Sequence, residues 1–257
     1  MTRAEAPADC VLRVTGLTKR FGDLVAVDSL DLEVRRGEIL GFLGPNGAGK
    51  TTALKMMCGL LRPDAGTVEI NGTPIVPGRT HDLAAIGLAP QNLVIWETLT
   101  CLEQLELMGR FYGRRRSEAR ARAEDLLAAF GLQEQARRLG RTLSGGMQRR
   151  LNIALGLVHE PEILFLDEPQ AGLDPQSRVL VRDHIQSLEG GVTVVITTHD
   201  MEEAEKLADR VCIIDRGRIL VLDTVAGLTR PLQAGGPARE ATLEDVFIGL
   251  TGRKLRE

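Results

Sequence analysis

The sequence contains few cysteines, and they lie far apart. The four are Cys10, Cys58, Cys101 and Cys212, and no two of them form a C-x-x-C pair. Because zinc sites and disulfide frameworks use cysteines in recognisable spacings, the sequence predicts neither kind of site. Scattered cysteines of this kind are typical of a protein that works in a reducing cytoplasm.

The sequence also lacks long apolar runs and a strong excess of charge of one sign. No apolar stretch approaches the roughly 18 to 20 residues that a membrane-spanning helix needs. The N-terminal residues MTRAEAPADC lack the basic and apolar regions of a signal peptide, so we expect a soluble chain that is not secreted. The formal net charge of -3 gives no general attraction to nucleic acid or to an anionic membrane surface.

What the sequence does contain is ordinary globular composition. Of its 257 residues, 43% are apolar and 26% are charged, which suits one sizeable domain or a core with a small appended lobe. There is no internal repeat and no low-complexity tract, and only Leu232–Arg239 resembles a loose linker. We therefore expect a single folded unit up to that point.

Apolar runs bounded by turn residues alternate with segments of helical periodicity, which predicts a parallel sheet covered by helices. The predicted strands of that sheet are Glu38–Leu43, Ile163–Leu166, Val192–Thr197 and Val211–Ile214. Three other segments in the first part of the chain alternate like half-buried antiparallel strands, with Asn71-Gly72 as a hairpin turn. They are Val11–Val14, Leu30–Val34 and Thr67–Ile70. The chain thus has an α/β core and a small antiparallel β lobe.

Between Thr98 and Val158 nearly all of the sequence has helical character, which predicts a helical lobe inserted between two strands of the central sheet. Thr100 and Glu103 have the spacing of a capping box. A later helix should begin at Asp174-Pro175, since this pair supplies an N-cap and a first-turn proline, and Gly190 is placed to end it.

The segment GPNGAGKT at residues 44–51 matches the P-loop pattern G-x-x-x-x-G-K-[ST], and it follows a predicted strand and precedes a helix. Its glycines let backbone N–H groups converge on phosphate oxygens, and the helix N-terminus adds a positive dipole end. Lys50 is expected to reach the β- and γ-phosphates, and the Thr51 hydroxyl to ligate Mg²⁺.

The second motif is acidic and follows the apolar run Ile163–Leu166, where the chain carries Asp167 and Glu168 in succession. Neighbouring residues on a strand point in opposite directions, so the two carboxylates can serve different tasks. Asp167 is the candidate for holding Mg²⁺. Glu168 is the candidate for orienting or deprotonating the attacking water.

The segment LSGGMQ at residues 143–148 resembles the signature of ABC (ATP-binding cassette) ATPases, with Met147 where that family usually has Gln. Ser144 is a good N-cap, and the following glycines leave N–H groups open at a helix start, which makes a second anion site. The signature lies 23 positions before Asp167, from 167 − 144. On these motifs the chain is similar to the ATP-hydrolysing subunits of ABC transporters.

The resemblance implies a P-loop NTPase fold with a RecA-like core. It divides the chain into a β lobe plus core at 10–92 and 159–228, a helical lobe at 93–158 and a short C-terminal extension at 229–257. It also implies ATP and Mg²⁺ as ligands, with Glu168, Gln91 of the Q-loop and the switch histidine His199 as catalytic residues. The residues implied to hold Mg²⁺ are Thr51, Gln91 and Asp167. Those implied to contact nucleotide are Phe21, Gly44, Pro45, Asn46, Gly47, Ala48, Gly49, Lys50, Thr51, Thr52, Ser144, Gly145, Gly146 and Asp174 of the D-loop.

The family also implies partners. Two cassettes would form a head-to-tail dimer around two ATP molecules, and transmembrane permease subunits would dock beside the Q-loop at Leu93–Trp96, which places the chain on the cytoplasmic face of the membrane. Interior packing is the alternative role for that apolar stretch, as it is for Phe21. Two further segments are similar to ABC-2-type exporters of drugs and antibiotics, MGRFYG at 108–113 and LEDVFIGLTGR at 243–253. An importer ATPase, or a non-transport ABC protein that acts on nucleic acid or ribosomes, is the alternative.

Overall fold

In the computed structural model, which describes residues 9–79, 82–233 and 241–252, the strands form two sheets. The larger sheet has the order β10-β9-β3-β8-β7-β6. Its pairs are parallel except for β9 and β10, which are antiparallel. The strands are β3 Ile39–Leu43, β6 Ile86–Ala89, β7 Ile163–Asp167, β8 Thr193–Thr198, β9 Arg210–Asp215 and β10 Arg218–Thr224. All four strands predicted for the parallel sheet are confirmed, whereas β6 and β10 were not predicted.

The smaller sheet is antiparallel and forms the predicted β lobe. Its order is β2-β1-β4-β5, with β1 Cys10–Phe21, β2 Leu24–Arg35, β4 Ala65–Ile70 and β5 Thr73–Pro74. Asn71 and Gly72 join β4 to β5 with φ angles of 48° and 72°. Positive φ at both central residues is the geometry that favours an Asn-Gly hairpin turn.

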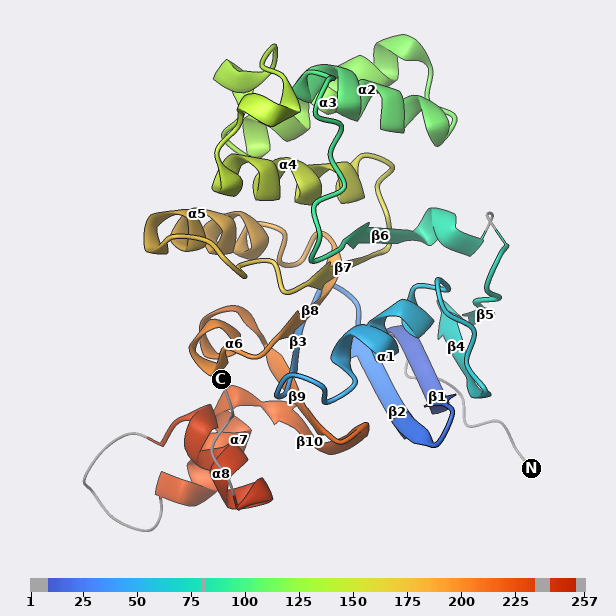
Figure 1. The fold of residues 1–257 in the computed structure, drawn as a ribbon, viewed down its shortest axis with the longest axis vertical. Coiled ribbons are helices and arrows are strands. Elements are labelled where there is room, and N and C mark those ends of the chain that lie inside the picture. The colour runs from blue at the N-terminus through green and yellow to red at the C-terminus, as the bar shows by residue number, and fades with distance from the viewer. Residues whose placement is uncertain (1–8, 80–81, 234–240, 253–257) are drawn as a thin grey trace.

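The helical lobe leaves the large sheet after β6 and returns to it at β7 (Figure 1). Its elements are α2 Cys101–Phe111, α3 Arg116–Ala129, the 3-10 turns η2 Gln133–Gln135 and η3 Gly140–Thr142, and α4 Gly145–Leu157. The predicted capping box starts α2, because Thr100 Oγ1 accepts from the Glu103 N–H and Glu103 accepts from the Thr100 N–H. The insertion of a helical lobe between two strands of the sheet is therefore confirmed.

The other helices flank the large sheet. α1 Lys50–Met57 contacts strands of both sheets, and its buried side chains join β1, β2 and the large sheet in one apolar cluster. The remaining elements are η1 Asp82–Ala85, α5 Pro175–Gln186, α6 Met201–Leu207, α7 Val225–Gln233 and α8 Leu243–Thr251. Figure 1 shows α7 and α8 at the opposite end of the molecule from the helical lobe. The predicted linker Leu232–Arg239 falls mostly outside the described residues.

The predicted start of α5 is correct, and its predicted end is not. Asp174 is the N-cap and its side chain accepts from the Ser177 N–H at 3.0 Å, with Pro175 in the first turn. The helix ends at Gln186, before Gly190, which has a φ of 75° in the loop that follows. Val181 and Ile185 already bury the apolar face of α5, so this face does not require another turn of helix before Gly190.

Candidate nucleotide site

The P-loop joins β3 to α1, at the carboxyl edge of the large sheet (Figure 1). Lys50 is the first residue of α1 and only 6% of it is exposed. Its ammonium group donates to the carbonyl oxygens of Gly44 at 2.7 Å and Pro45 at 3.2 Å. Burial lowers the pKa of Lys50, while the negative charge of Glu168 opposes that shift. A buried positive charge beside the positive end of the helix dipole is unfavourable for the stability of α1. The same arrangement is favourable for binding an anionic ligand.

The loop can take this shape because of Gly49. This residue is the N-cap of α1 and has a φ of 103°. A Cβ atom at Gly49 would lie 2.3 Å from the carbonyl oxygen of Ala26 on β2. Both the left-handed backbone and the close approach of β2 therefore exclude a larger residue.

Asp167 lies at the end of β7 and faces two threonine hydroxyls. Its Oδ1 is 3.2 Å from Thr51 Oγ1 of α1 and 2.5 Å from Thr197 Oγ1 of β8. Asp167 is 4% exposed and Thr197 is fully buried. The structure thus brings together two of the three residues expected to hold Mg²⁺, Thr51 and Asp167, from motifs that are distant in the sequence.

Glu168 directly follows β7 and has a φ of 49°, which is unusual for a residue with a Cβ atom. Its N–H donates to the Thr197 carbonyl oxygen at 3.0 Å and lies 3.1 Å from Thr197 Oγ1, which stabilises this conformation. The carboxylate lies 2.6 Å from His199 Nδ1 and 3.5 Å from Lys50 Nζ. Backbone strain at a buried acid between a lysine and a histidine is typical of a functional site.

The signature lies elsewhere in the molecule, at the start of α4. Ser144 is the N-cap and its Oγ accepts from the Met147 N–H at 3.3 Å. A Cβ atom at Gly146 would lie 2.5 Å from Ser177 Oγ on α5, so α5 excludes any larger side chain there. In Figure 1, α4 lies in the helical lobe, well apart from the junction of β3 and α1. One chain therefore presents its P-loop and its signature at separate places.

The remaining predicted residues include several that lie at the ends of other strands and helices. Gln91 follows β6 with an exposed side chain, and Asp174 uses its carboxylate to cap α5. Phe21 ends β1 and is 51% exposed, with Lys19 Nζ 5.7 Å from its ring centroid. The predicted alternative, in which Phe21 packs in the interior, is therefore wrong. Thr52 lies in the first turn of α1, and Gly145 in the first turn of α4.

The donor set at Asp167 fits Mg²⁺ better than a metal held by protein alone. Within residues 9–79, 82–233 and 241–252, no group of three or more His, Cys, Asp or Glu side chains could hold a metal ion. Mg²⁺ commonly takes one or two carboxylates from the protein, and water and substrate phosphates supply its other ligands. One carboxylate and one hydroxyl beside a P-loop match that requirement.

Thr197, which contacts both members of the acidic pair, is not among the residues predicted from the sequence. A signal was available, because parallel strands end at the same edge of a sheet and Thr197 immediately precedes Thr198 and His199. The structure pairs Asp167 with Thr197 across β7 and β8. Polar residues at the ends of adjacent parallel strands are candidates for one site.

Comparison with known proteins agrees with this geometry. Residues 27–171 match the ABC transporter family. The chain is 45% identical over 239 residues to Daunorubicin resistance ATP-binding protein DrrA3 of Streptomyces coeruleorubidus, covering 93% of this chain and 75% of that protein. The chain belongs to the ABC transporter family. It is also 40% identical over 248 residues to Linearmycin resistance ATP-binding protein LnrL of Bacillus subtilis, covering 96% of this chain and 76% of LnrL.

Solved structures show the same fold. An ATP-binding subunit of an ABC transporter superposes with a TM-score of 0.81 at 28% identity, covering 94% of this chain and 99% of that one. A dimeric ATP-binding cassette bound to ADP and Pi gives a TM-score of 0.73 at 28% identity, covering 83% and 98%. The predicted family and fold are confirmed, and as an ABC ATPase the chain binds and hydrolyses ATP.

Proposed function

We propose that this ATPase powers export of a substrate through partner transmembrane subunits. Similarity to DrrA3 and LnrL, both named as resistance ATP-binding proteins, supports export. So does 45% identity over 210 residues to Nod factor export ATP-binding protein I of Ralstonia nicotianae, which covers 81% of this chain and 65% of that protein. No helix in the described ranges has the length and apolar character to cross a bilayer. As the ATP-binding subunit of an ABC transporter, the chain would reach the cytoplasmic face of the membrane through its membrane subunits.

The observation that carries the catalytic part of the proposal is the placement of Glu168. Its carboxylate contacts Lys50 Nζ and His199 Nδ1, so it lies where the P-loop lysine and the switch histidine meet. Glu168 would orient the attacking water and accept its proton, while Lys50 holds the phosphates and His199 contacts the γ-phosphate. Mg²⁺, held by Thr51, Asp167 and Gln91, would neutralise charge on the phosphate oxygens.

We assign each ATP to two chains because the signature is remote from the P-loop of its own chain. In a head-to-tail dimer, Ser144, Gly145 and Gly146 of one copy would meet the nucleotide held by the P-loop of the other. The N-terminus of α4 suits that role, because its N–H groups and dipole end can bind an anion. Closing the dimer on ATP and opening it after hydrolysis would supply the movement that drives transport.

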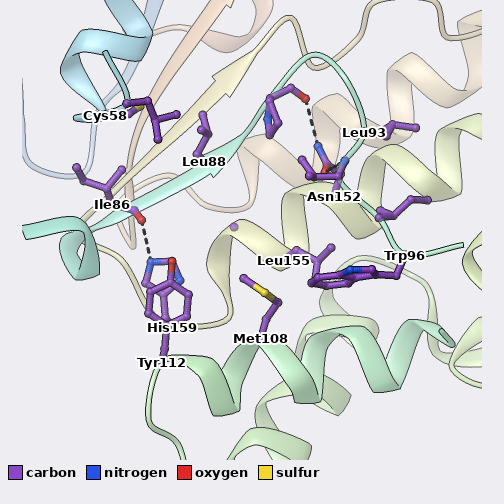
Figure 2. Close-up of a pocket in the computed structure, with 15 residues that line it drawn as sticks. Cys58, Ile86, Leu88, Leu93, Trp96, Met108, Tyr112, Asn152, Leu155 and His159 are labelled. Carbon is purple, nitrogen blue, oxygen red and sulfur yellow. Dashed lines mark hydrogen bonds between the residues drawn. The ribbon is translucent and has the colours of Figure 1, made fainter. Parts of the chain in front are cut away.

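The surface that would receive the membrane subunit is an apolar pocket of about 700 Å³ between β6, α2 and α4. Figure 2 shows Trp96, Leu93 and Met108 around it, together with the ring of Tyr112 stacked on His159. Trp96 is 40% exposed and Val94 is 61% exposed, so the predicted alternative of interior packing is not what the structure has. An exposed apolar pocket containing a tryptophan suits a protein interface.

Mixed dimers test the shared sites. Lys50→Ala removes the phosphate-binding cation, and Ser144→Arg places a bulky side chain at the start of α4. Each variant should be inactive as a homodimer, because both of its sites carry the lesion. In a mixed dimer both lesions fall in one composite site, so the other site is intact and part of the ATPase activity returns.

Subunit exchange is checked by pulling down one variant through a tag on the other. If mixed dimers form and bind ATP but no activity returns, the assignment of each ATP to two independent composite sites is wrong. Full activity of the Ser144→Arg homodimer would exclude contact between the signature and the nucleotide.

A further inference from the structure

Arg149, on the signature helix α4, holds the main chain of the Q-loop. Its two terminal nitrogens donate to consecutive carbonyl oxygens, Pro90 at 3.1 Å and Gln91 at 2.9 Å. A guanidinium group offers two terminal nitrogens held rigidly in one plane, so each can donate to its own acceptor, whereas the ammonium of lysine is a single donor centre on a flexible stem. Arg149 therefore fixes the direction of the backbone on both sides of the peptide that joins Pro90 to Gln91.

Asn152 adds two more contacts to the same segment, residues 90–96, which we call the Q-loop segment. Its Oδ1 accepts from the Val94 N–H at 3.0 Å, and its Nδ2 donates to the Pro90 carbonyl oxygen at 3.3 Å (Figure 2). Residues 149 and 152 are three apart on a helix and so lie on one face. The segment has no regular secondary structure, so these side chains replace the hydrogen bonds that a sheet would provide.

Stability alone does not account for an arginine at this place. Arg149 is only 6% exposed, and its Nε has no hydrogen-bond partner among the described residues. Burial lowers the pKa of its guanidinium, and the negative charge of Asp167 partly opposes this. A buried cation with incomplete partners stabilises a fold less than an apolar residue would. The position of the Q-loop main chain, which Arg149 fixes, therefore explains the arginine better than stability does.

The helix that carries these residues reaches both regions the proposed function couples. Its first turn is the signature, and Asn152, Leu155 and Gly156 line the apolar pocket. Arg149 is three residues past Gly146, a rise of about 4.5 Å, which is less than one turn. Since α4 is closely packed, movement of the Q-loop segment can be passed to the signature with little loss.

We propose that Arg149 and Asn152 are positioning residues that make the Q-loop segment and the signature helix move as one unit. The inference rests on the proposed function, in which a partner fills the pocket and the signature closes on ATP. In this role Arg149 acts through its bonds to the main chain of the Q-loop segment, and Asn152, although it lines the pocket, acts through its bonds to the same segment. They set where Gln91 and Trp96 lie when Gly146 engages nucleotide.

The test uses Trp96, the only tryptophan of the chain, as the reporter on the Q-loop segment. In a Glu168→Gln background, acrylamide quenching of Trp96 is measured with and without ATP and Mg²⁺. Dimer formation is followed by size-exclusion chromatography. Mg-ATP should change the quenching constant, and adding Arg149→Met should abolish most of that change. ATP affinity should stay within about twofold, because the P-loop is untouched.

Arg150→Met is the matched control, because Arg150 is also a buried arginine that donates to two carbonyl oxygens. Those are Phe130 at 2.7 Å and Gly131 at 3.3 Å, both far from the Q-loop segment in the chain. This variant should keep the Trp96 response even if it lowers stability. Arg149→Lys, with one donor centre, should retain part of the response, and Asn152→Leu should reduce it. If Arg149→Met does not fold, Arg149→Lys and Asn152→Leu provide the test in its place.

A full Trp96 response in Arg149→Met dimers would overturn the inference, as would an equal loss in Arg150→Met. Dimers of the parent that form on ATP without any Trp96 response would also overturn it, and would leave the proposed function standing. If the parent forms no dimer on ATP, the composite sites fail first, and this inference fails with them.

Discussion

Glu203 of α6 is a buried acid whose charge state should set part of the pH dependence of stability. Its Oε2 accepts from Thr198 Oγ1 at 2.7 Å, while its Oε1 is buried without a hydrogen-bond partner among the described residues. Burial raises the pKa of Glu203 from 4.5 to about 7. The bond from Thr198 opposes the shift, and the negative charges of Asp200 and Glu168 add to it.

The direction follows from proton binding. Below pH 4.5 the folded and unfolded chains both hold the proton, and the burial of Glu203 as an acid costs nothing extra. Between pH 4.5 and about 7 the unfolded chain releases this proton while the folded chain keeps it, so stability falls over that range and levels off above pH 7, where both forms carry the carboxylate. At about 1.4 kcal/mol per pKa unit, the loss between pH 5 and pH 8 comes to about 2.5 kcal/mol. The Glu203→Gln variant has no ionisable group at position 203, so it should not show this loss.

Urea unfolding at the two pH values, followed by far-UV circular dichroism, measures the effect. With an m-value of about 2 to 3 kcal/mol/M, the midpoint of the natural chain should fall by roughly 1 M more than that of Glu203→Gln. Glu202→Gln is the control, since Glu202 is exposed on the same helix and its ion pair with Lys206 lowers its pKa. Equal pH dependence in the natural chain and in Glu203→Gln would refute the reasoning.

Three further substitutions separate the functions proposed for the site and the pocket. Glu168→Gln should keep ATP binding and lower turnover by about 100-fold or more, with ATP-bound dimers accumulating; near-normal hydrolysis with Mg²⁺ would exclude Glu168 as the base. Lys50→Ala should instead weaken ATP binding itself, measured by equilibrium titration with labelled nucleotide, and unchanged affinity would contradict its contact with phosphate. Trp96→Asp should reduce recruitment to membranes that contain the co-expressed membrane subunit and leave ATP binding intact. Unfolding of the isolated Trp96→Asp chain would mean that Trp96 is a core residue.

The candidate nucleotide site could be predicted from the sequence where its signal is local. The P-loop lies between a buried strand and a helix start, and each of the three features is visible within about 15 residues. Asp167 and Glu168 end a wholly apolar strand. Arg149 has no such local signal, because its partners are main-chain groups distant in the sequence. The signal for Thr197 is not local either, since it depends on aligning the ends of β7 and β8.

The strand β6 was missed for a physical reason. Its sequence IGLA is short and contains Gly87, which weakens a strand prediction. The structure requires glycine there, since a Cβ atom at Gly87 would lie 2.3 Å from the Gly156 carbonyl oxygen of α4. The close packing of the signature helix on the sheet therefore requires glycine at position 87. The local sequence pattern contains no information about this packing.

The strand β1 was predicted too short, because only Val11–Val14 alternates regularly. In the structure β1 continues to Phe21, with shifts of register against β2 after Val14 and again after Leu17. Each irregularity changes which face a side chain occupies, so the period of two is lost. Pairing with β2 and β4 maintains the strand where its own pattern does not.

The burial of α4 has a consequence for how this chain tolerates substitution. Of its 13 residues, 10 are buried, whereas α3 buries only four of 14, at Ala119, Ala123, Leu126 and Leu127. In a saturation mutagenesis experiment, α3 should show the alternation of permissive and sensitive positions that marks a surface helix. From Arg149 to Leu157, α4 should show no permissive face at all. Lineages of this chain could then vary freely around α3, while sequence change along α4 would need compensating changes in β6, α2 or α5.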